Sequence, residues 1–296
     1  MKSRTIPQSV LGIAIIGLLS ACAAPLPWPE SPLYDFPVST PGADYPRTLD
    51  EAMAAIAGTY AHFDVVAYED NTTATPMRTL IVSYGTTEFR VEDGKLIQID
   101  SFCHAKQLIN QQSVEVEFSD AATRAIRPRV QEVELTFVDG MWHIYRPATP
   151  TLLGIDGDPS LPLSTDPDDP NLTDPDGDGK PGVTVKLRMG GFIDGEIYIT
   201  RREIYENYLV FHADGHLYGH VVDGSEQFVI GASLGILEQP SNQVQLADPG
   251  MNPIILIPME GLIPMEGTDA REGAMDPCED FPAPDAGLFP DPPSFQ

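Results

Sequence analysis

Apolar and polar positions alternate along much of this chain, and this two-residue period predicts strands. Residues 80–84 and 133–137 each place their apolar side chains on one face, as a half-buried strand requires. Strand-like segments rich in Val, Ile and aromatic residues resume at 183 and continue to 232. The apolar run at 254–257 is expected to be the last strand.

Asp-Gly dipeptides mark the ends of several of these segments. They occur at 93–94, 139–140, 214–215 and 223–224. Both residues of the dipeptide tolerate the positive φ angles of a type I′ turn, so each occurrence predicts a two-residue hairpin. Because hairpins join antiparallel strands, the pattern predicts a mostly antiparallel protein.

The register that these turns would impose agrees with the apolar pattern. A two-residue turn at 139–140 places Phe137 opposite Trp142, and a turn at 93–94 places Glu92 opposite Lys95. Matched cross-strand pairs of this kind stabilise a hairpin and fix its register.

We therefore expect a mainly β fold, an antiparallel β-barrel of about ten strands, because a closed barrel leaves no strand edge unpaired. A two-sheet β-sandwich is the alternative. Helical spacing occurs only at 48–58, where Leu49, Met53 and Ile56 share a face, and a second short helix is expected at 119–126. The aromatic residues expected in the core are Phe137, Trp142, Tyr198, Tyr218 and Phe228.

The first 21 residues have the three parts of a signal peptide. Lys2 and Arg4 precede an apolar run at 10–19 that is too short to cross a bilayer core. Small residues follow, as a signal peptidase requires. The run ends in Leu19-Ser20-Ala21-Cys22, which resembles the lipobox of bacterial lipoproteins.

This resemblance implies that the chain is cleaved after Ala21 and that Cys22 is lipidated and becomes the mature N-terminus. Two or more acyl chains, with palmitate as an expected component, would anchor the protein durably in a membrane. The next residue is Ala23, whereas an Asp at this position is the family's usual signal for inner-membrane retention. The resemblance therefore implies the outer membrane of the cell envelope.

The composition limits the partners of the chain. It holds 44 Asp and Glu against 17 Lys and Arg, a formal net charge of −27. Such a field repels nucleic acid and anionic lipid headgroups, and we exclude both as partners. It attracts cations, including divalent ones.

Only three cysteines are present, and lipidation of Cys22 leaves Cys103 and Cys278. An exported pair with no competing thiol is expected to form a disulfide. Closing a loop of this length is worth on the order of 4–5 kcal/mol in the chain-entropy model. Two free thiols, one of them catalytic, are the alternative.

Proline, glycine and aspartate divide the chain into regions. Two halves of one β domain flank a connector with eight Asp between 156 and 178, and Pro-rich segments lie at both ends. The expected organisation is a signal peptide (1–21), a Pro-rich tether (22–46), a β domain (47–262, with halves 47–146 and 183–262 around the acidic connector 147–182) and an acidic Pro-rich tail (263–296).

The connector contains the most specific internal motif, Asp174-Pro175-Asp176-Gly177-Asp178-Gly179. Carboxylates at alternate positions converge on one point when the chain turns sharply at the glycine, and calcium prefers such hard oxygen ligands. The segment resembles the calcium loops of EF-hand, dockerin and thrombospondin type 3 modules. The resemblance implies Asp174, Asp176 and Asp178 as side-chain ligands and the Lys180 carbonyl as a backbone ligand.

The motif also departs from an EF-hand. Val185 stands where that family has its bidentate Glu, and a strand pattern follows where a helix should leave the loop. A further carboxylate would have to come from Asp166, Asp168 or Asp169. We therefore expect a structural calcium site, with a solvated acidic linker as the alternative.

The chain contains two patterns that suggest catalytic chemistry, and the surrounding sequence opposes both. A two-residue turn at 214–215 would place His212 opposite Leu217, away from His216 and His220, which opposes a zinc site. The segment 231–235 matches G-x-S-x-G, but no histidine follows it in the chain, as that hydrolase motif requires.

The sequence thus predicts a non-enzymatic, membrane-anchored lipoprotein, stabilised by calcium, with a structural or binding role in the envelope or at the cell surface. Its partner would be an envelope protein or an apolar ligand. One alternative is a lipocalin-like barrel that carries an apolar small molecule, which requires a cavity lined by apolar side chains. Another is an enzyme with an unrecognised site, which requires titratable groups converging in a cleft.

Overall fold

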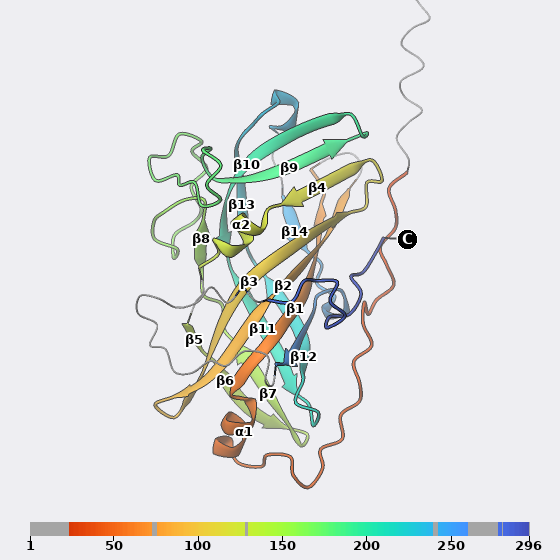
Figure 1. Cartoon of the computed structure of the whole chain (residues 1–296), viewed down its shortest axis with the longest axis vertical. Coiled ribbons are helices and arrows are strands. Elements are labelled where there is room, and N and C mark those ends of the chain that lie inside the picture. The colour runs from red at the N-terminus through yellow and green to blue at the C-terminus, as the bar shows by residue number, and fades with distance from the viewer. Residues whose placement is uncertain are drawn as a thin grey trace, which may run out of the picture.

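The computed structural model describes residues 24–72, 76–127, 130–238, 242–259, 278–279 and 281–295. Cys22 and its lipobox, and most of the segment before Cys278, lie outside these residues. The described part is mainly antiparallel β, as the alternation predicts, with two α-helices among its elements (Figure 1). No helix in the described ranges is long and apolar enough to span a bilayer.

The larger sheet has ten strands in the order β5-β3-β2-β1-β15-β12-β11-β7-β6, with β14 paired to β1. Its first and last strands are consecutive in the chain and are separated by Val133 alone, so the sheet curls into a nearly closed barrel. The strands are β1 (Gly58–Asp70), β2 (Met77–Glu92), β3 (Lys95–Ile109), β5 (Val130–Glu132), β6 (Glu134–Val138), β7 (Met141–Arg146), β11 (Tyr205–Phe211), β12 (Leu217–Asp223), β14 (Gln243–Gln245) and β15 (Pro253–Pro258).

A second sheet of five strands lies at one end of the molecule (Figure 1). Its order is β13-β10-β9-β4, with β8 paired to β10. The antiparallel barrel is therefore confirmed for the larger sheet, and the second sheet is an addition that the alternation alone did not distinguish. Its elements are β4 (Val114–Phe118), β8 (Thr151–Leu153), β9 (Val183–Met189), β10 (Ile193–Glu203) and β13 (Glu226–Ala232), accompanied by α2 (Asp120–Arg124) and the 3₁₀ turn η1 (Gly235–Leu237).

Helix α1 (Leu49–Ile56) begins at a capping box. The Thr48 hydroxyl accepts a hydrogen bond from the Glu51 amide, and the Glu51 carboxylate accepts one from the Thr48 amide. Met53 and Ile56 are buried, as predicted, but Leu49, the first residue of the helix, is 48% exposed.

Two of the four predicted hairpins are confirmed in register. The turns at 93–94 and 139–140 have positive φ at both residues. Glu92 pairs with Lys95 and Phe137 with Trp142, as the two-residue turn requires.

The prediction at 214–215 is wrong by one residue. Phe211 pairs with Leu217, and the His212 amide donates to the His216 carbonyl at 2.9 Å, so the loop has three residues. Only Gly215 has a positive φ there, which is typical of a three-residue hairpin loop.

The hairpin predicted at 223–224 is also wrong. β12 pairs with β11 and β15, whereas β13 pairs with β10 in the second sheet. The chain therefore crosses between sheets here, and neither residue has a positive φ. An Asp-Gly dipeptide does not distinguish a hairpin from a crossover, because long-range packing determines which strands pair with the two that it joins.

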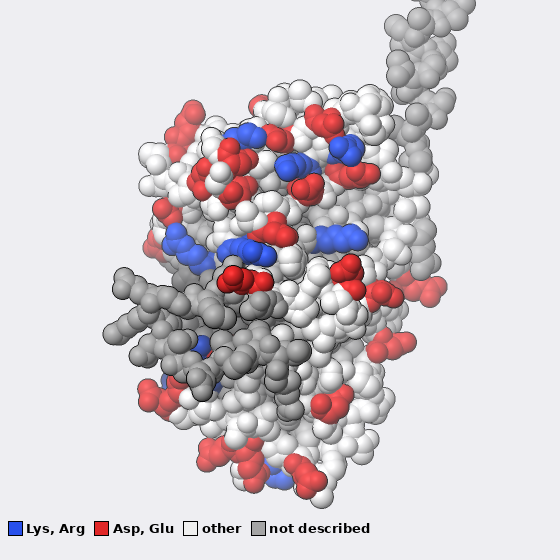
Figure 2. Space-filling view, in the orientation of Figure 1, with Lys and Arg blue, Asp and Glu red and all other residues white. Residues whose placement is uncertain are grey.

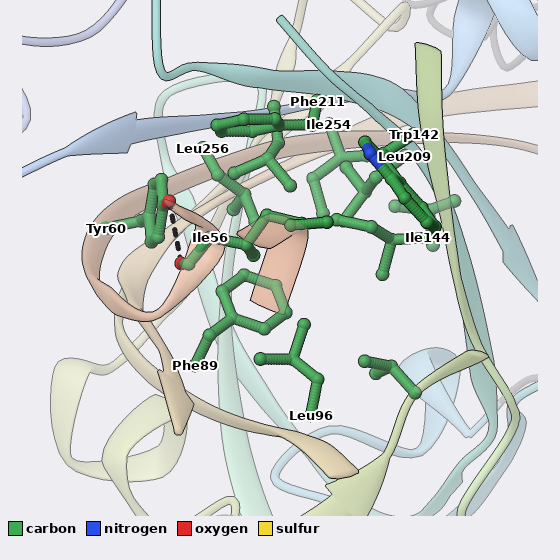
Figure 3. Close-up of a cluster of buried hydrophobic side chains, with 14 of the residues drawn as sticks. Ile56, Tyr60, Phe89, Leu96, Trp142, Ile144, Leu209, Phe211, Ile254 and Leu256 are labelled. Atoms are coloured by element: carbon green, nitrogen blue, oxygen red, sulfur yellow. Dashed lines mark hydrogen bonds between the residues drawn. The ribbon is translucent and has the colours of Figure 1, made fainter. Parts of the chain in front are cut away.

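One end of the barrel is filled by side chains (Figure 3). Ile56 from α1 packs among residues from β1, β2, β7, β11 and β15, and Tyr60 donates its hydroxyl to the Ile56 carbonyl at 2.8 Å. This cluster closes the barrel at the end where α1 lies. It includes Phe89, Leu96, Trp142, Ile144, Leu209, Phe211, Ile254 and Leu256.

The described residues near both ends of the chain pack on the outer face of the barrel. Residues 24–46, predicted as a tether, are extended, and part of this segment packs on the sheet through Trp28, Tyr34 and Phe36. Phe281 and Phe289 pack on the same face. Figure 1 shows the N-terminal segment running along one side of the molecule toward α1.

The disulfide between Cys103 and Cys278 is present, as predicted from the cysteine count. Both cysteines are buried, and they join β3 to the C-terminal segment across 175 residues of sequence. The bond therefore fixes the segment that covers the outer face.

A candidate ligand cavity and a candidate calcium loop

The interior between the barrel and the second sheet holds a cavity of about 460 Å³. This volume lies within the usual range for small-molecule sites. Its walls come from both sheets, and most of the lining is apolar. The apolar lining includes Val66, Ile81, Phe102, Val114, Val116, Phe118, Val185, Leu187, Met189, Ile197, Ile199, Val221 and Val229.

The alternation of β9 explains how the second sheet makes a wall. Val185, Leu187 and Met189 line the cavity, whereas Lys186 and Arg188, which alternate with them, point away. On the outer side Arg188 pairs with Asp194 at 2.7 Å. Figure 2 shows acidic and basic side chains intermixed over the end of the molecule where β4, β9 and β10 lie.

A buried polar network lies between the cavity and the packed end of the barrel. His62 contacts Asp64 Oδ2 through Nε2 at 2.7 Å and Thr87 Oγ1 through Nδ1 at 2.8 Å. Thr87 donates to Asp100 Oδ1 at 2.7 Å, and Arg146 Nε lies 3.1 Å from Asp100 Oδ2.

Asp64 is the member of this network that lines the cavity. Its side chain is 7% exposed, and one oxygen is paired with His62. The other oxygen, Oδ1, is buried and has no hydrogen-bond partner among the described residues. A buried acceptor without a partner is costly, so Asp64 offers an acceptor that a ligand could use.

A second polar group on the cavity wall is centred on Arg201. Its Nε and Nη2 donate to the two carboxylate oxygens of Glu203 at 2.7 and 3.2 Å, and its Nη1 donates to Gln227 at 3.0 Å. All three guanidinium nitrogens therefore have partners. Arg201, Glu203 and Gln227 all line the cavity.

Asp223, at the end of β12, completes this polar region. It accepts from the Tyr68 hydroxyl at 2.6 Å and from the Ser225 hydroxyl at 2.6 Å. Burial and the nearby carboxylate of Glu203 raise the pKa of Asp223, and burial together with Asp223 raises the pKa of Tyr68 well above its usual value. Both hydrogen-bond partners of Asp223 are neutral, and Arg201, whose charge acts on Asp223, is itself paired with Glu203.

Tyr205 connects the network to the polar region. Its ring lines the cavity and lies 4.2 Å from the Arg146 guanidinium carbon. Burial and then the charge of Asp100 raise the pKa of its hydroxyl well above the usual value. The cavity thus has apolar walls and one polar, mostly acidic region.

The predicted calcium loop forms a compact turn in the structure. Asp174 accepts hydrogen bonds from the amides of Gly177, Asp178 and Gly179 at 2.8 to 3.1 Å. Gly177 and Gly179 have positive φ, which lets the chain turn back on the carboxylate. Oxygen atoms of Asp174, Asp176 and Asp178 lie within 4.8 Å of one another.

The loop is joined directly to β9. The Thr184 amide donates to Asp176 Oδ2 at 2.9 Å, and its hydroxyl donates to Asp178 at 2.6 Å. Burial raises the pKa of Asp176 despite the opposing hydrogen bond from the Thr184 amide, whereas the Thr184 hydroxyl lowers the pKa of Asp178. Asp176 Oδ1 is buried without a hydrogen-bond partner among the described residues.

The other predicted ligands are placed as follows. The Lys180 side chain pairs with Glu196 and lies 3.7 Å from Asp178 Oδ2, so its ammonium already neutralises part of the loop. Asp166 and Asp169 accept hydrogen bonds from amides two residues ahead. Among described residues, the group that could hold a metal contains Asp174, Asp176 and Asp178 alone.

The aromatic predictions are only partly right. Trp142 is buried, but Phe137, its cross-strand neighbour on β6, is 42% exposed. Tyr198, Tyr218 and Phe228 are half-buried. None of the five lines the cavity.

Sequence reasoning missed the residues that matter most for the cavity. His62 was not singled out, although it is 1% exposed and central to the network. His212 and His216 instead pack on the Tyr218 ring. The available signal for His62 and Asp64 was two polar residues at alternate positions in an otherwise apolar strand.

Comparison of this chain with protein-family models, with curated proteins and with solved structures found no match. The geometry alone therefore carries the functional argument.

Proposed function

We propose that this protein is an envelope lipoprotein that binds an apolar small molecule in its internal cavity, with calcium stabilising the acidic connector. The observation that carries the proposal is the cavity of about 460 Å³ with its apolar lining. Apolar walls with a few polar groups are typical of ligand sites. A packed barrel interior would have opposed this function.

Titratable groups do converge at the cavity, as the enzyme alternative requires. Arg201 and Glu203 saturate each other, and His62 is held between Thr87 and Asp64. Side chains that already hydrogen-bond one another in this way are suited to fixing the shape and polarity of a site. We therefore propose binding rather than catalysis.

A bulky side chain in the cavity should block binding. Val229 on β13 is half-buried and lines the cavity. Val229→Trp is expected to lower the affinity for decanol at least tenfold, because the indole fills the space the alkyl chain would occupy. Isothermal titration calorimetry measures this affinity. Val244→Trp, at an exposed position on β14, is the control and should bind as the unmodified chain does; equal loss in both variants would contradict the proposal.

Calcium binding is proposed from the loop geometry. Three carboxylates face one point, and the Asp174 carboxylate is oriented by three amides, as in a preformed ligand set. Because Thr184 ties the loop to β9, a bound cation would stabilise the start of a strand that forms the cavity wall. A structural role for the cation follows from this connection.

Asp176→Ala is expected to abolish the calorimetric heat of calcium binding. Extracellular calcium modules bind with dissociation constants of about 10⁻⁴–10⁻³ M, so calcium at ten times that constant should stabilise the protein by about 1.4 kcal/mol. Asp166→Ala, in the same connector but outside the cluster, should keep both the heat of calcium binding and the stabilisation by calcium. Equal heats from the two variants would rule out this loop as the site.

Membrane anchoring through Cys22 is proposed from the lipobox, and the described residues next to it support the arrangement. Gln112 donates to the Ala24 carbonyl at 2.8 Å, and the Leu26 amide donates to Asn110 at 2.8 Å. Residue 24 is thus held at the end of β3. Phe192, on the neighbouring β9–β10 turn, is 78% exposed and would face a membrane at this end.

Cys22→Ser is expected to abolish metabolic labelling of the protein with a palmitate analogue, because the acylated thiol is lost. Cys278→Ser removes a cysteine of the disulfide instead and should leave the label in place. Labelling that persists in Cys22→Ser would show that the motif is not a lipobox. Fractionation of the labelled envelope would then assign the membrane.

A further inference from the structure

The charges around the cavity are unbalanced. Asp64, Asp70, Glu203 and Asp223 line it, against one basic residue, Arg201. A balanced site would be indifferent to the charge of a ligand. The wall of this cavity instead carries more carboxylates than cationic groups, in a region shielded from water.

The single guanidinium is not free to meet an anion. Its Nε and Nη2 bind Glu203, and its Nη1 binds Gln227. A ligand carboxylate would have to displace Glu203, leaving a buried carboxylate without its cation. Such an exchange gains no new ion pair and costs the desolvation of the incoming charge.

The acidic groups, in contrast, can still accept a hydrogen bond or a positively charged partner. Asp223 receives hydrogen bonds from the neutral groups of Tyr68 and Ser225, and Asp64 Oδ1 has no partner in the described part of the chain. Asp64 is itself more than nine-tenths buried. A cationic ligand group could donate a hydrogen bond to Asp64 Oδ1 and pair its charge with Asp223. An anionic ligand group would be repelled by these carboxylates.

Resting on the proposed binding function, we infer that the cavity selects an amphipathic molecule whose polar group is a cation, such as a primary ammonium, and discriminates against carboxylates. The apolar walls would hold the hydrocarbon part. Asp223 would pair with the cationic group, and Asp64 would accept a further hydrogen bond from it. Long-chain amines, rather than fatty acids, are the ligand class that this chemistry recognises.

Three probes of equal chain length test the inference: decylammonium, decanol and decanoate. Calorimetry on the full chain, refolded without detergent and with its disulfide oxidised, measures each affinity at pH 7, where the amine and the acid are both charged. We expect decylammonium to bind at least tenfold more tightly than decanol, and decanoate more weakly than decanol. Decanoate binding as tightly as decylammonium, or more tightly, would overturn the inference alone. Failure of all three probes to bind would overturn the binding function as well.

Two variants locate the selectivity. Asp223→Asn should bring the affinity ratio of decylammonium to decanol toward one, because the amide keeps an acceptor for Tyr68 but carries no charge. Glu203→Gln should raise decanoate affinity at least tenfold relative to decanol, since Arg201 then loses its anionic partner. Asp50→Asn, in the exposed first turn of α1, should keep the order of the three probes. An unchanged order in both cavity variants would assign the selectivity elsewhere and overturn the roles of Asp223 and Glu203.

Discussion

Loss of the Cys103–Cys278 disulfide is expected to lower the free energy of unfolding by about 4–5 kcal/mol, the largest effect of any change considered for this chain. The bond closes a loop across 175 residues, so its removal gives the unfolded chain much more conformational freedom. The double variant Cys103→Ala/Cys278→Ala, unfolded in guanidinium chloride, measures the difference. Its m-value should also rise, because a chain without the cross-link exposes more surface on unfolding.

Cys22→Ser provides the matched control, since it removes the remaining cysteine and leaves the disulfide in place. Its unfolding midpoint should equal that of the unmodified domain. A loss below about 1 kcal/mol in the double variant would show that the chain-entropy model fails here. In that case the packing of Phe281 and Phe289 against the barrel, rather than the bond, would hold the C-terminal segment.

Arg146→Met is expected to destabilise the protein by about 3–5 kcal/mol, the usual cost of removing one partner of a buried ion pair. Arg146 and Asp100 are each 1% exposed, and Arg146 also donates to the Tyr205 carbonyl at 2.9 Å. Methionine leaves the Asp100 charge without its guanidinium, and the hydrogen bonds that remain come from the neutral groups of Thr87, Gln98 and Tyr205. Denaturant unfolding of the variant measures the loss.

Two further variants separate charge from packing in this region. Lys95→Met breaks the surface pair with Glu132, in which both side chains are more than half exposed, and should leave the midpoint nearly unchanged. Arg146→Met/Asp100→Asn removes both buried charges and should recover part of the lost stability. No recovery would mean that Arg146 stabilises the barrel mainly by packing on Tyr205.

Local interactions explain which parts of the fold could be predicted. Helix α1 follows from a capping box between Thr48 and Glu51, and the hairpins at 93–94 and 139–140 follow from dipeptides that accept positive φ. Each of these signals is complete within a few residues. The Asp174-Asp176-Asp178 cluster belongs to the same group, because one loop supplies all of its members.

The loops at 214–215 and 223–224 show where local reasoning fails. The same dipeptide serves a three-residue loop in one place and a crossover between sheets in the other. The difference depends on which strands β12 and β13 pair with, and those partners are distant in sequence. Turn chemistry permits both outcomes and selects neither.

By itself the sequence determined the strand-rich class, the antiparallel hairpins, the cysteine pairing and the compact acidic loop, since composition and near neighbours suffice for each. Only the tertiary structure decided which apolar faces pack and which enclose a cavity. Val66 and Leu256 look alike in the sequence, yet only Val66 lines the cavity. The tertiary structure also brought Asp64, Arg201 and Asp223 onto one wall from three strands. Burial and electrostatic balance depend on side chains from distant strands, so no local pattern encodes them.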